Sequence, residues 1–253
     1  MNLDQLRFPD NLQTLSGTPV ILCNLTMSDV LLPAGWLSET ESDRLHNISS
    51  PEQAYLYQLS RCILRAVLGH FIGISPEAVT FEVQPHGKLQ LSGNQFQFNI
   101  SHSQHWLAIA VSGSPVGIDI EYSEVHTRQR SWLSIARRFF TEEEYLHLNA
   151  LPASDVHTAF TRFWTQKEAV LKAHGNGLNA GLHKLDLLSQ QHSLDQQTYW
   201  LEYGEPVPQV QCAISTQNHR QEPVIYYILN EQLEIHPLQP PYISHLCLKP
   251  DSL

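Results

Sequence analysis

The order strand, helix, strands occurs twice along this chain of 253 residues, and that order constrains the fold more than any single motif does. We therefore expect an α+β fold built from two lobes. The predicted N-terminal lobe covers 1–115, and the predicted C-terminal lobe covers 116–253 and ends in a Pro-containing tail. The residues themselves show no internal repeat, so the expectation rests on the order of elements alone.

Two long helices are the clearest local predictions. Residues 51–73 begin after a serine with Pro51 near the first turn, carry apolar residues at helical spacing and close on Gly73. A second helix is expected over 154–174, with a length of about 30 Å at 1.5 Å per residue. It ends at glycines that can take the left-handed conformation in which helices often stop.

Shorter elements surround these helices. Residues 37–45 are expected to form a short helical turn or a loop, and a helix is expected over 130–140. Another helix is expected over 141–151, where Thr141 and Glu144 have the spacing of a capping box. Strand-like segments are expected at 18–27, 80–84, 96–103, 106–113, 116–121, 183–188, 198–203, 210–215 and 224–229. The turn sequence at 112–115 predicts an antiparallel hairpin between 106–113 and 116–121.

The charge balance limits the kinds of partner. The formal net charge is −10, with only 15 Lys and Arg residues. Because duplex binding depends on neutralising phosphates, this balance argues against a nucleic-acid partner. The basic residues gather in one segment, where an anionic partner is expected: Arg128, Arg130, Arg137, Arg138, Arg162, Lys167 and Lys172.

Cysteine usage and hydropathy indicate the compartment. Cys23, Cys62, Cys212 and Cys247 lie far apart without a C-x-x-C pair, so reduced thiols are expected rather than a zinc site or a disulfide framework. No apolar run is long enough to cross a bilayer, and the first ten residues lack a basic region followed by an apolar core. We expect a soluble cytoplasmic protein with no membrane partner.

A pair of carboxylates interrupts the apolar run at 114–125. Asp119 and Glu121 are two residues apart, so in a strand they share one face while Ile118 and Ile120 share the other. Oxygen ligands of this kind suit Mg²⁺, which commonly bridges carboxylates and substrate phosphates. An edge strand with one solvated polar face explains the same pattern, and spacing does not decide between the two.

The second long helix carries a further group. Trp164, Glu168 and Lys172 follow one another at i, i+4 and i+8 and so share one helix face. A functional interpretation makes Glu168 a third metal ligand or a base and Lys172 a cation near a transferred phosphate. A surface ion pair, worth a few tenths of a kcal/mol, has the same spacing.

A third group lies upstream. Ser101 precedes His102, but no G-x-S-x-G elbow is present, and adjacent residues in a strand point to opposite faces, so serine hydrolase chemistry is improbable. Phosphate binding fits better, because Lys88, Ser101 and His102 can all donate to anionic oxygens.

Taken in order, the segments "GK", "FNISHS", "GIDIE" and "FWTQKEAVLKAHGNGL" resemble the 4'-phosphopantetheinyl transferases of the surfactin-synthetase-activating (Sfp-like) type. The resemblance covers about residues 85–178, and the preceding helix matches more loosely. It implies a pseudo-twofold pair of similar α+β lobes with coenzyme A in the cleft between them.

The resemblance also implies roles for individual residues. The implied Mg²⁺ ligands are Asp119, Glu121 and Glu168, and the implied catalytic residues are Glu168, Lys172 and Asp119. The implied coenzyme A contacts are Arg44, Arg61, Gly87, Lys88, Asn99, Ser101, His102 and Lys172, with Arg44 and Arg61 at the adenosine 3'-phosphate. Gly175 matches a second motif glycine and Trp164 the aromatic residue at the start of the helix motif. Leu89 stands where the family usually has proline.

The activity implied is Mg²⁺-dependent transfer of 4'-phosphopantetheine from coenzyme A to a serine of an acyl or peptidyl carrier protein, with release of adenosine 3',5'-bisphosphate. The carrier is expected to be acidic and to dock on Arg128, Arg130, Arg137 and Arg138 with Phe139 and Phe140, although these two Phe side chains could equally be core. A monomer is expected, because the two lobes form a pseudo-dimer.

Two other functions would use the same residues. A Mg²⁺-dependent pyrophosphohydrolase would use the carboxylates to activate water and would consume coenzyme A without a protein acceptor. A non-enzymatic relative would only bind coenzyme A or a carrier protein. The presence of Asp119, Glu121, Glu168 and Lys172 together argues against this second alternative.

Overall fold

The computed structural model describes residues 1–10, 12, 17–27, 30–93, 96–122, 132–177, 181–189, 192–217 and 223–238. The predicted contacts Arg128 and Arg130, together with Cys247 and the tail from 239, lie outside these residues. Cys23, Cys62 and Cys212 are buried free thiols. Within the described part of the chain, no helix combines the length and the apolar character needed to span a bilayer.

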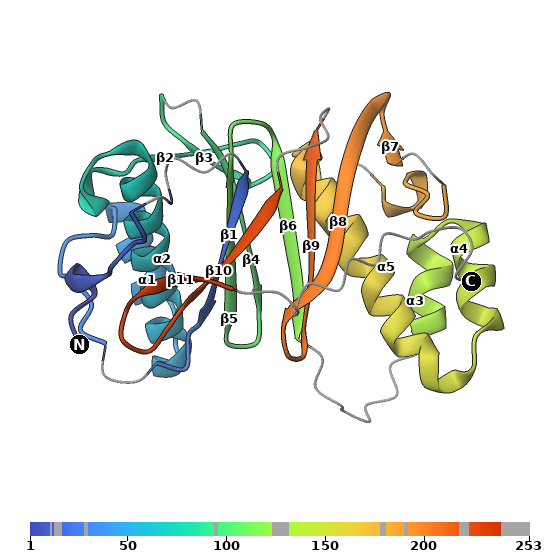
Figure 1. Cartoon of the computed structure of the whole chain (residues 1–253), viewed down its shortest axis with the longest axis horizontal. Coiled ribbons are helices and arrows are strands. Elements are labelled where there is room, and N and C mark those ends of the chain that lie inside the picture. The colour runs from blue at the N-terminus through green and yellow to red at the C-terminus, as the bar shows by residue number, and fades with distance from the viewer. Residues whose placement is uncertain are drawn as a thin grey trace.

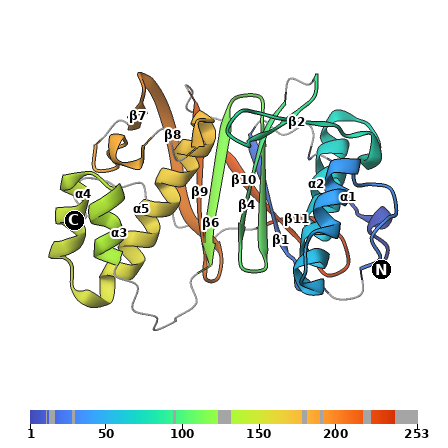
Figure 2. The ribbon, with the colours of Figure 1, turned by 180° about the vertical axis from the view of Figure 1, so that it is seen from behind.

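Two sheets lie face to face with helices on both outer sides, so the molecule has helix, sheet, sheet and helix layers (Figures 1 and 2). The first sheet has the order β11-β10-β1-β5-β4, the second has the order β6-β9-β8-β7, and β2 and β3 form a separate hairpin. The strands of the first sheet are β1 (Thr18–Asn24), β4 (Gln97–Ser103), β5 (Trp106–Ser112), β10 (Val224–Leu229) and β11 (Ile235–Pro237). The remaining strands are β2 (Phe81–Val83), β3 (Leu89–Leu91), β6 (Val116–Tyr122), β7 (His192–Leu194), β8 (Gln197–Val207) and β9 (Val210–Gln217). This arrangement confirms the predicted α+β class.

The helices begin and end largely where their sequences predict. They are α1 (Glu39–His46), α2 (Pro51–Ile72), α3 (Trp132–Phe139), α4 (Glu142–Ala150) and α5 (Ala153–His174). The Ser50 hydroxyl caps α2, and Gly73 ends it with φ 72°. The predicted capping box of Thr141 and Glu144 is present on α4. The segment expected to be a short helical turn or a loop is the helix α1, which has its own capping box from Ser38 and Glu41.

Apolar residues fill the spaces between the layers. Strand β1 is buried on both faces. Val20 and Leu22 contribute to the core between the sheets, whereas Ile21 and Cys23 contribute to the core beneath α2. A third cluster joins α3, α4 and α5 to β7 and β8. The two long helices therefore cover opposite outer faces of the sheet pair.

The hairpin predicted for 106–121 is wrong. Strand β5 pairs antiparallel with β4 and with β1, while β6 crosses to the second sheet and pairs antiparallel with β9. The turn between β5 and β6 therefore leads from one sheet to the other. A local turn signal predicts that the chain reverses, but it does not identify the strand that will supply the backbone partners.

The strand predicted at 183–188 is also wrong. This segment contains a 3-10 helix, Leu182–Lys184, followed by bends. Its carbonyls are taken by a buried lysine, because Lys167 Nζ donates to the backbone oxygens of Leu182 and Leu185. Lys167 also pairs with Glu144 at 2.7 Å. Lys167 is thus a structural cation inside the protein and is not available to an anionic partner.

The first sheet takes strands from both ends of the chain. Strand β10 pairs parallel with β1, and β11 pairs antiparallel with β10. The division at 115 and 116 expected from the sequence places these two strands in the second lobe, whereas their pairing places them in the first sheet. The described chain therefore leaves the first sheet after β5 and returns to it at β10.

Helix α5 approaches β6 most closely at Gly117. A Cβ atom at this position would overlap the backbone oxygen of Ala169 and the backbone nitrogen of Ala173. Only glycine lets the helix lie this close to the strand, and the residues that α5 and β6 place next to each other depend on that approach.

We expect Gly117→Ala to destabilise the protein by about 3 kcal/mol or more, because the clash is with backbone atoms that cannot rotate away. Gly113→Ala is the matched control, since the Cβ there would meet open space; its cost should stay within about 0.5 kcal/mol. Urea unfolding followed by circular dichroism measures both changes. Equal effects of the two substitutions would contradict this role of Gly117.

Candidate functional site

Side chains of β4 join the two sheets at their common edge. Alternate residues of β4 each accept a hydrogen bond from a backbone N–H of β6. The pairs are Asn99 Oδ1 with Ile118 at 2.9 Å, Ser101 Oγ with Ile120 at 3.3 Å and Ser103 Oγ with Tyr122 at 2.9 Å. We call this set of three bonds the β4–β6 seam. These side-chain bonds replace the backbone hydrogen bonds that two neighbouring strands of one sheet would form.

The predicted carboxylate pair lies on the β6 face that is turned toward α5. Ile118 and Ile120 pack between the sheets, while Asp119 and Glu121 share the opposite face with Gly117. Asp119 is 6% exposed, and its Oδ1 accepts from Lys172 Nζ at 2.7 Å. The structure therefore places Lys172 of α5 on Asp119 of β6, as a partly buried ion pair.

The two seam serines also hold the carboxylates. Ser101 Oγ donates to Asp119 Oδ1 at 2.9 Å, and Ser103 Oγ donates to Glu121 Oε2 at 3.1 Å. Lys172 Nζ lies 3.0 Å from Ser101 Oγ. Burial raises the pKa of Asp119, and the Lys172 ammonium and the Ser101 hydroxyl oppose that rise.

Glu168 lies one helical turn before Lys172 on α5. Burial raises the pKa of Glu168 to about 7; the negative charge of Asp119 adds to the rise, Lys172 opposes it, and Glu121 adds a smaller increase. Glu168 is therefore coupled to both carboxylates of β6. Trp164, the third residue of the predicted helix face, packs instead against Phe160 and Phe139 in the helical layer.

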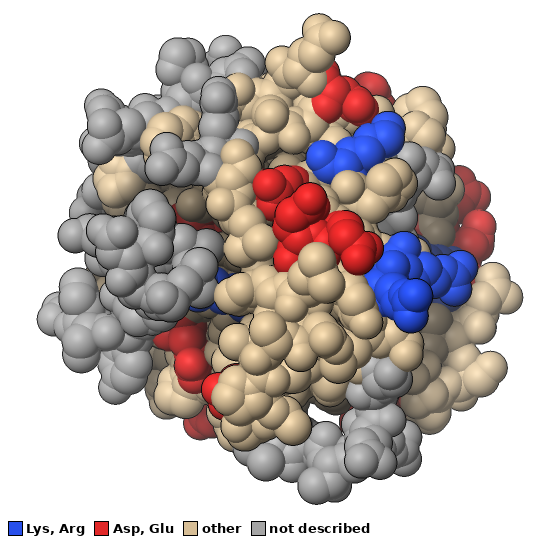
Figure 3. Space-filling view, turned by 90° about the vertical axis from the view of Figure 1, so that its right-hand side faces the viewer, with Lys and Arg blue, Asp and Glu red and all other residues tan. Residues whose placement is uncertain are grey.

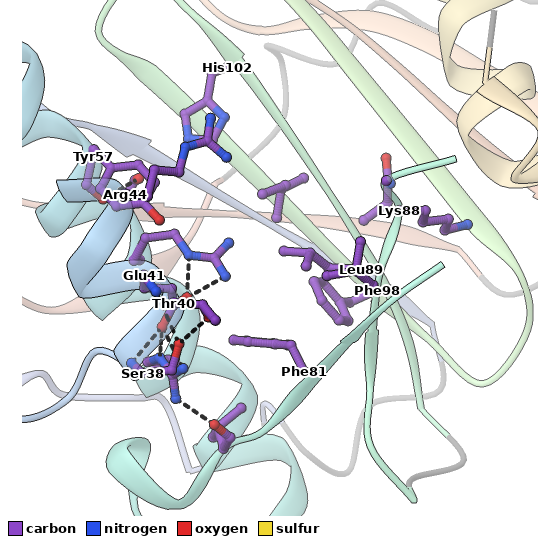
Figure 4. A pocket seen from close by; sticks show the side chains of 18 of the residues that line it. Ser38, Thr40, Glu41, Arg44, Tyr57, Phe81, Lys88, Leu89, Phe98 and His102 are labelled. Carbon is purple, nitrogen blue, oxygen red and sulfur yellow. Dashed lines mark hydrogen bonds and ion pairs between the residues drawn. The ribbon is translucent and has the colours of Figure 1, made fainter. Parts of the chain in front are cut away.

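A cavity of about 1040 Å³ lies beside this cluster. Its walls come from α1, α2, the β2–β3 hairpin and β4, with Lys172 and Gly175 at the end of α5 closing one side. Figure 4 shows Arg44 and Tyr57 on one wall and Lys88, Leu89 and Phe98 on the other. Lys172 lines the cavity and also touches Asp119, so the cavity and the carboxylates meet at this side chain.

Lys88, directly before β3, and His102 of β4 both line the cavity. Lys88 Nζ donates to the backbone oxygens of Lys172 at 2.7 Å and Val116 at 3.3 Å, and burial lowers its pKa to about 8. His102 is an exposed residue that lines the cavity. Burial, followed by the charges of Lys172 and Arg61, lowers its pKa to about 4. His102 is thus neutral at pH 7 in the ligand-free protein.

The two arginines expected at the adenosine 3'-phosphate have different surroundings. Arg61 is 8% exposed and its Nε donates to Glu41 Oε1 at 2.6 Å. Arg65 binds the other oxygen of Glu41 and the carbonyl of Val79. Arg44 lies over the Tyr57 ring and has no acidic partner in the described part of the chain. Arg44 is therefore the more available cation of the two.

Residue-type patterns missed several members of the site. Glu41 was not singled out, because its arginine partners lie 20 and 24 positions further along the chain. Ser103 was missed although the strand period of two, which relates it to Ser101, was a usable signal. The two motif glycines both have positive φ: Gly87 lies in the β2–β3 turn and Gly175 at the end of α5.

The donor types in the cluster fit a divalent cation. Asp119, Glu121 and Glu168 offer only oxygens, and Asp119 Oδ2 is buried without a hydrogen-bond partner in the described structure. Among the residues that the structure describes, no three His, Cys, Asp or Glu side chains already lie close enough to hold a metal ion together. Binding one would require these side chains to converge.

Comparisons with known proteins agree with the motifs. The family model of the 4'-phosphopantetheinyl transferase superfamily matches residues 115–223. The 4'-phosphopantetheinyl transferase HetI of Nostoc sp. is 38% identical over 161 residues, 61% of this chain and 65% of that protein. The corresponding enzyme gsp of Aneurinibacillus migulanus is 31% identical over 177 residues, 70% of this chain and 64% of that protein. Sfp of Bacillus subtilis is 30% identical over 159 residues, 58% of this chain and 69% of that protein. The chain thus spans slightly less than two thirds of the first two relatives and slightly more of the third.

We expect the stability of the metal-free protein to fall as the pH rises from about 4.5 to about 7, because ionising Glu168 is unfavourable in the folded state. The unfolded chain loses this proton near pH 4.5 and the folded protein near pH 7, so the contribution of Glu168 to stability is largest below that window. Glu168→Gln should remove on the order of 1 to 3 kcal/mol of this pH dependence.

Urea unfolding at pH 5 and pH 8 with a chelator present measures the difference. Glu231→Gln, at an exposed position in the turn after β10, serves as the control. An unchanged pH dependence in Glu168→Gln would show that Glu168 titrates normally in the folded protein.

Proposed function

Because the chain belongs to the 4'-phosphopantetheinyl transferase superfamily, we propose that it transfers 4'-phosphopantetheine from coenzyme A to a serine of an acyl or peptidyl carrier protein. The products are the holo-carrier protein and adenosine 3',5'-bisphosphate. Such carriers serve fatty acid, polyketide or nonribosomal peptide synthesis. Coenzyme A and reduced cysteines suit a cytoplasmic enzyme, and a single chain with two lobes suits a monomer that is itself a pseudo-dimer.

One observation carries the proposal: Lys172 lines the large cavity and is also the ion-pair partner of Asp119. The cavity is large enough for a nucleotide-sized ligand and offers cationic and neutral donors from Arg44, Lys88 and His102. A pyrophosphate that extended from this cavity toward β6 would meet Lys172 first and the carboxylates next.

We assign the Mg²⁺ site to Asp119, Glu121 and Glu168. When bound, the ion would neutralise the charge of the pyrophosphate and orient its oxygens. The unpartnered Asp119 Oδ2 supports this assignment, as do the negative charges of Asp119 and Glu121, which add to the rise that burial causes in the pKa of Glu168.

The remaining steps belong to side chains of this chain. The carrier serine oxygen forms a bond to the β-phosphorus of coenzyme A while the bond from that phosphorus to the bridging oxygen breaks. We assign to Glu168 the role of accepting the serine proton. Lys172 neutralises the charge that the leaving 5'-phosphate gains.

The carrier protein is proposed to dock beside α3. Arg137 and Arg138 are exposed there, while Phe140 is a core residue stacked on Phe160. Figure 3 shows this side of the molecule, where basic groups stand next to acidic ones. Local attraction to an acidic helix would therefore come from the arginines of α3, and it would weaken as salt screens it.

The function is tested by incubating the protein with coenzyme A, Mg²⁺ and a panel of apo-carrier proteins, followed by intact-mass measurement. We expect a phosphopantetheine-sized gain on at least one carrier. Glu168→Gln should lower the rate by at least about 100-fold, because it removes the base. Glu231→Gln is the matched control and should keep the rate of the unmodified protein.

Two results would contradict the proposal. Hydrolysis of coenzyme A without modification of any carrier would indicate a pyrophosphohydrolase. Binding of coenzyme A with neither reaction would indicate a relative that only binds.

A second prediction concerns the adenosine 3'-phosphate. Arg44→Ala should weaken coenzyme A binding about tenfold, because it removes a charge-assisted hydrogen bond, and it should leave the affinity for 3'-dephospho-coenzyme A unchanged. Calorimetric titration measures both affinities, with Arg7→Ala as a control at a position that pairs with Glu234 and does not line the cavity. Equal losses for the two ligands would place Arg44 elsewhere on the nucleotide.

A further inference from the structure

The β4–β6 seam repeats one arrangement twice. Ser101 accepts the N–H of Ile120 and donates to Asp119, the residue before it; Ser103 accepts the N–H of Tyr122 and donates to Glu121. Each serine thus binds a carboxylate and the backbone immediately after that carboxylate. The spacing of two residues on both strands brings the arrangement into register.

The third bond of the seam lacks a carboxylate. Asn99 accepts the N–H of Ile118, and the residue before Ile118 is Gly117. An amide at this position can hold the strands together, but it has no acid to orient. The hydroxyls therefore occur in the seam at the two positions where an acid precedes the bonded N–H.

The Ser101 hydroxyl has only one hydrogen to donate, which limits the number of its partners. A hydroxyl has one hydrogen and two acceptor sites. In Ser101 the hydrogen goes to Asp119 Oδ1, and the acceptor sites receive Ile120 N and Lys172 Nζ. No hydrogen is left for a phosphate oxygen in this arrangement, so the role of Ser101 here lies with Asp119 rather than with coenzyme A.

The Ser103 contact acts on a longer side chain than the Ser101 contact does. Glu121 is partly exposed and lies near the end of β6, whereas Asp119 is shorter and buried. A longer side chain has more rotamers to lose when it becomes a ligand. A hydrogen bond to one oxygen restricts those rotamers before the ion arrives.

We infer that Ser103 is a positioning residue, which holds Glu121 in the orientation needed for the divalent cation. This inference rests on the metal site assigned under the proposed function. Ser103 lies outside the large cavity and is not among the coenzyme A contacts implied by the motifs. Its proposed effect is therefore on cation affinity and not on coenzyme A affinity.

The test uses Mn²⁺ as the probe and electron paramagnetic resonance of the substrate-free protein to measure free Mn²⁺. Ser103→Ala should weaken Mn²⁺ binding roughly tenfold, the lower end of the effect expected from loss of an outer-shell partner. Ser103→Thr keeps the hydroxyl and should restore most of the affinity. In the transfer assay, a higher Mg²⁺ concentration should recover the rate of Ser103→Ala without a change in KM for coenzyme A.

Ser215→Ala is the matched control. Ser215 is a buried serine on β9, paired in register with Gly117, and its hydroxyl has no hydrogen-bond partner in the described structure. Its removal should leave Mn²⁺ binding unchanged.

Two outcomes would overturn the inference. One is Mn²⁺ affinity in Ser103→Ala equal to that of the unmodified protein or of Ser215→Ala. The other is an equal loss in Ser103→Thr and Ser103→Ala, which would indicate a steric effect. Failure of the proposed function looks different, because the unmodified protein itself would then fail to modify any carrier.

Discussion

The β4–β6 seam is the interaction on which the candidate site depends. Three side chains of β4 supply the acceptors that a neighbouring backbone would otherwise supply, so the two sheets meet without forming one continuous ladder. The β4–β6 seam places the end of the cavity beside the carboxylates of β6. Helix α5 reaches the same seam because Gly117 allows the close approach, and it brings Glu168 and Lys172 with it. Cavity, acids and lysine are thus assembled by two local contacts.

Both halves of the protein hold buried basic side chains in the same way. In each, a short helix begins with a capping box whose glutamate turns inward to a basic residue of the long helix that follows. Glu41 of α1 binds Arg61 and Arg65 of α2, and Glu144 of α4 binds Lys167 of α5. A buried ion pair is favourable only when hydrogen bonds satisfy its remaining atoms. The carbonyls of Val79 and of Leu182 and Leu185 meet that requirement.

The sequence predicted the parts of the structure that local chemistry determines. Caps and glycines located the helices, and strand alternation placed Asp119 and Glu121 on one face with Ile118 and Ile120 on the other. It could not predict partners that are distant in sequence. The β5–β6 hairpin failed because β6 finds its backbone partner in β9, almost 100 positions later. The ion pair of Arg61 with Glu41 could not be predicted, because the two residues are 20 positions apart. The same holds for the contacts of Lys167 with the carbonyls of Leu182 and Leu185, in the region where a strand was expected.

The return of β10 to the first sheet has a consequence for the order in which the molecule can fold. Strand β1 lies between β10 and β5, so its apolar residues lack a neighbour on one side until about 200 further residues have been synthesised. Contacts of such long range slow folding, and an unpaired apolar strand edge invites association with other chains. In the second sheet the longest separation is shorter, because β6 pairs with β9 almost 100 positions later. During synthesis the first half of this chain therefore has the greater need of a chaperone, although its sequence emerges from the ribosome first.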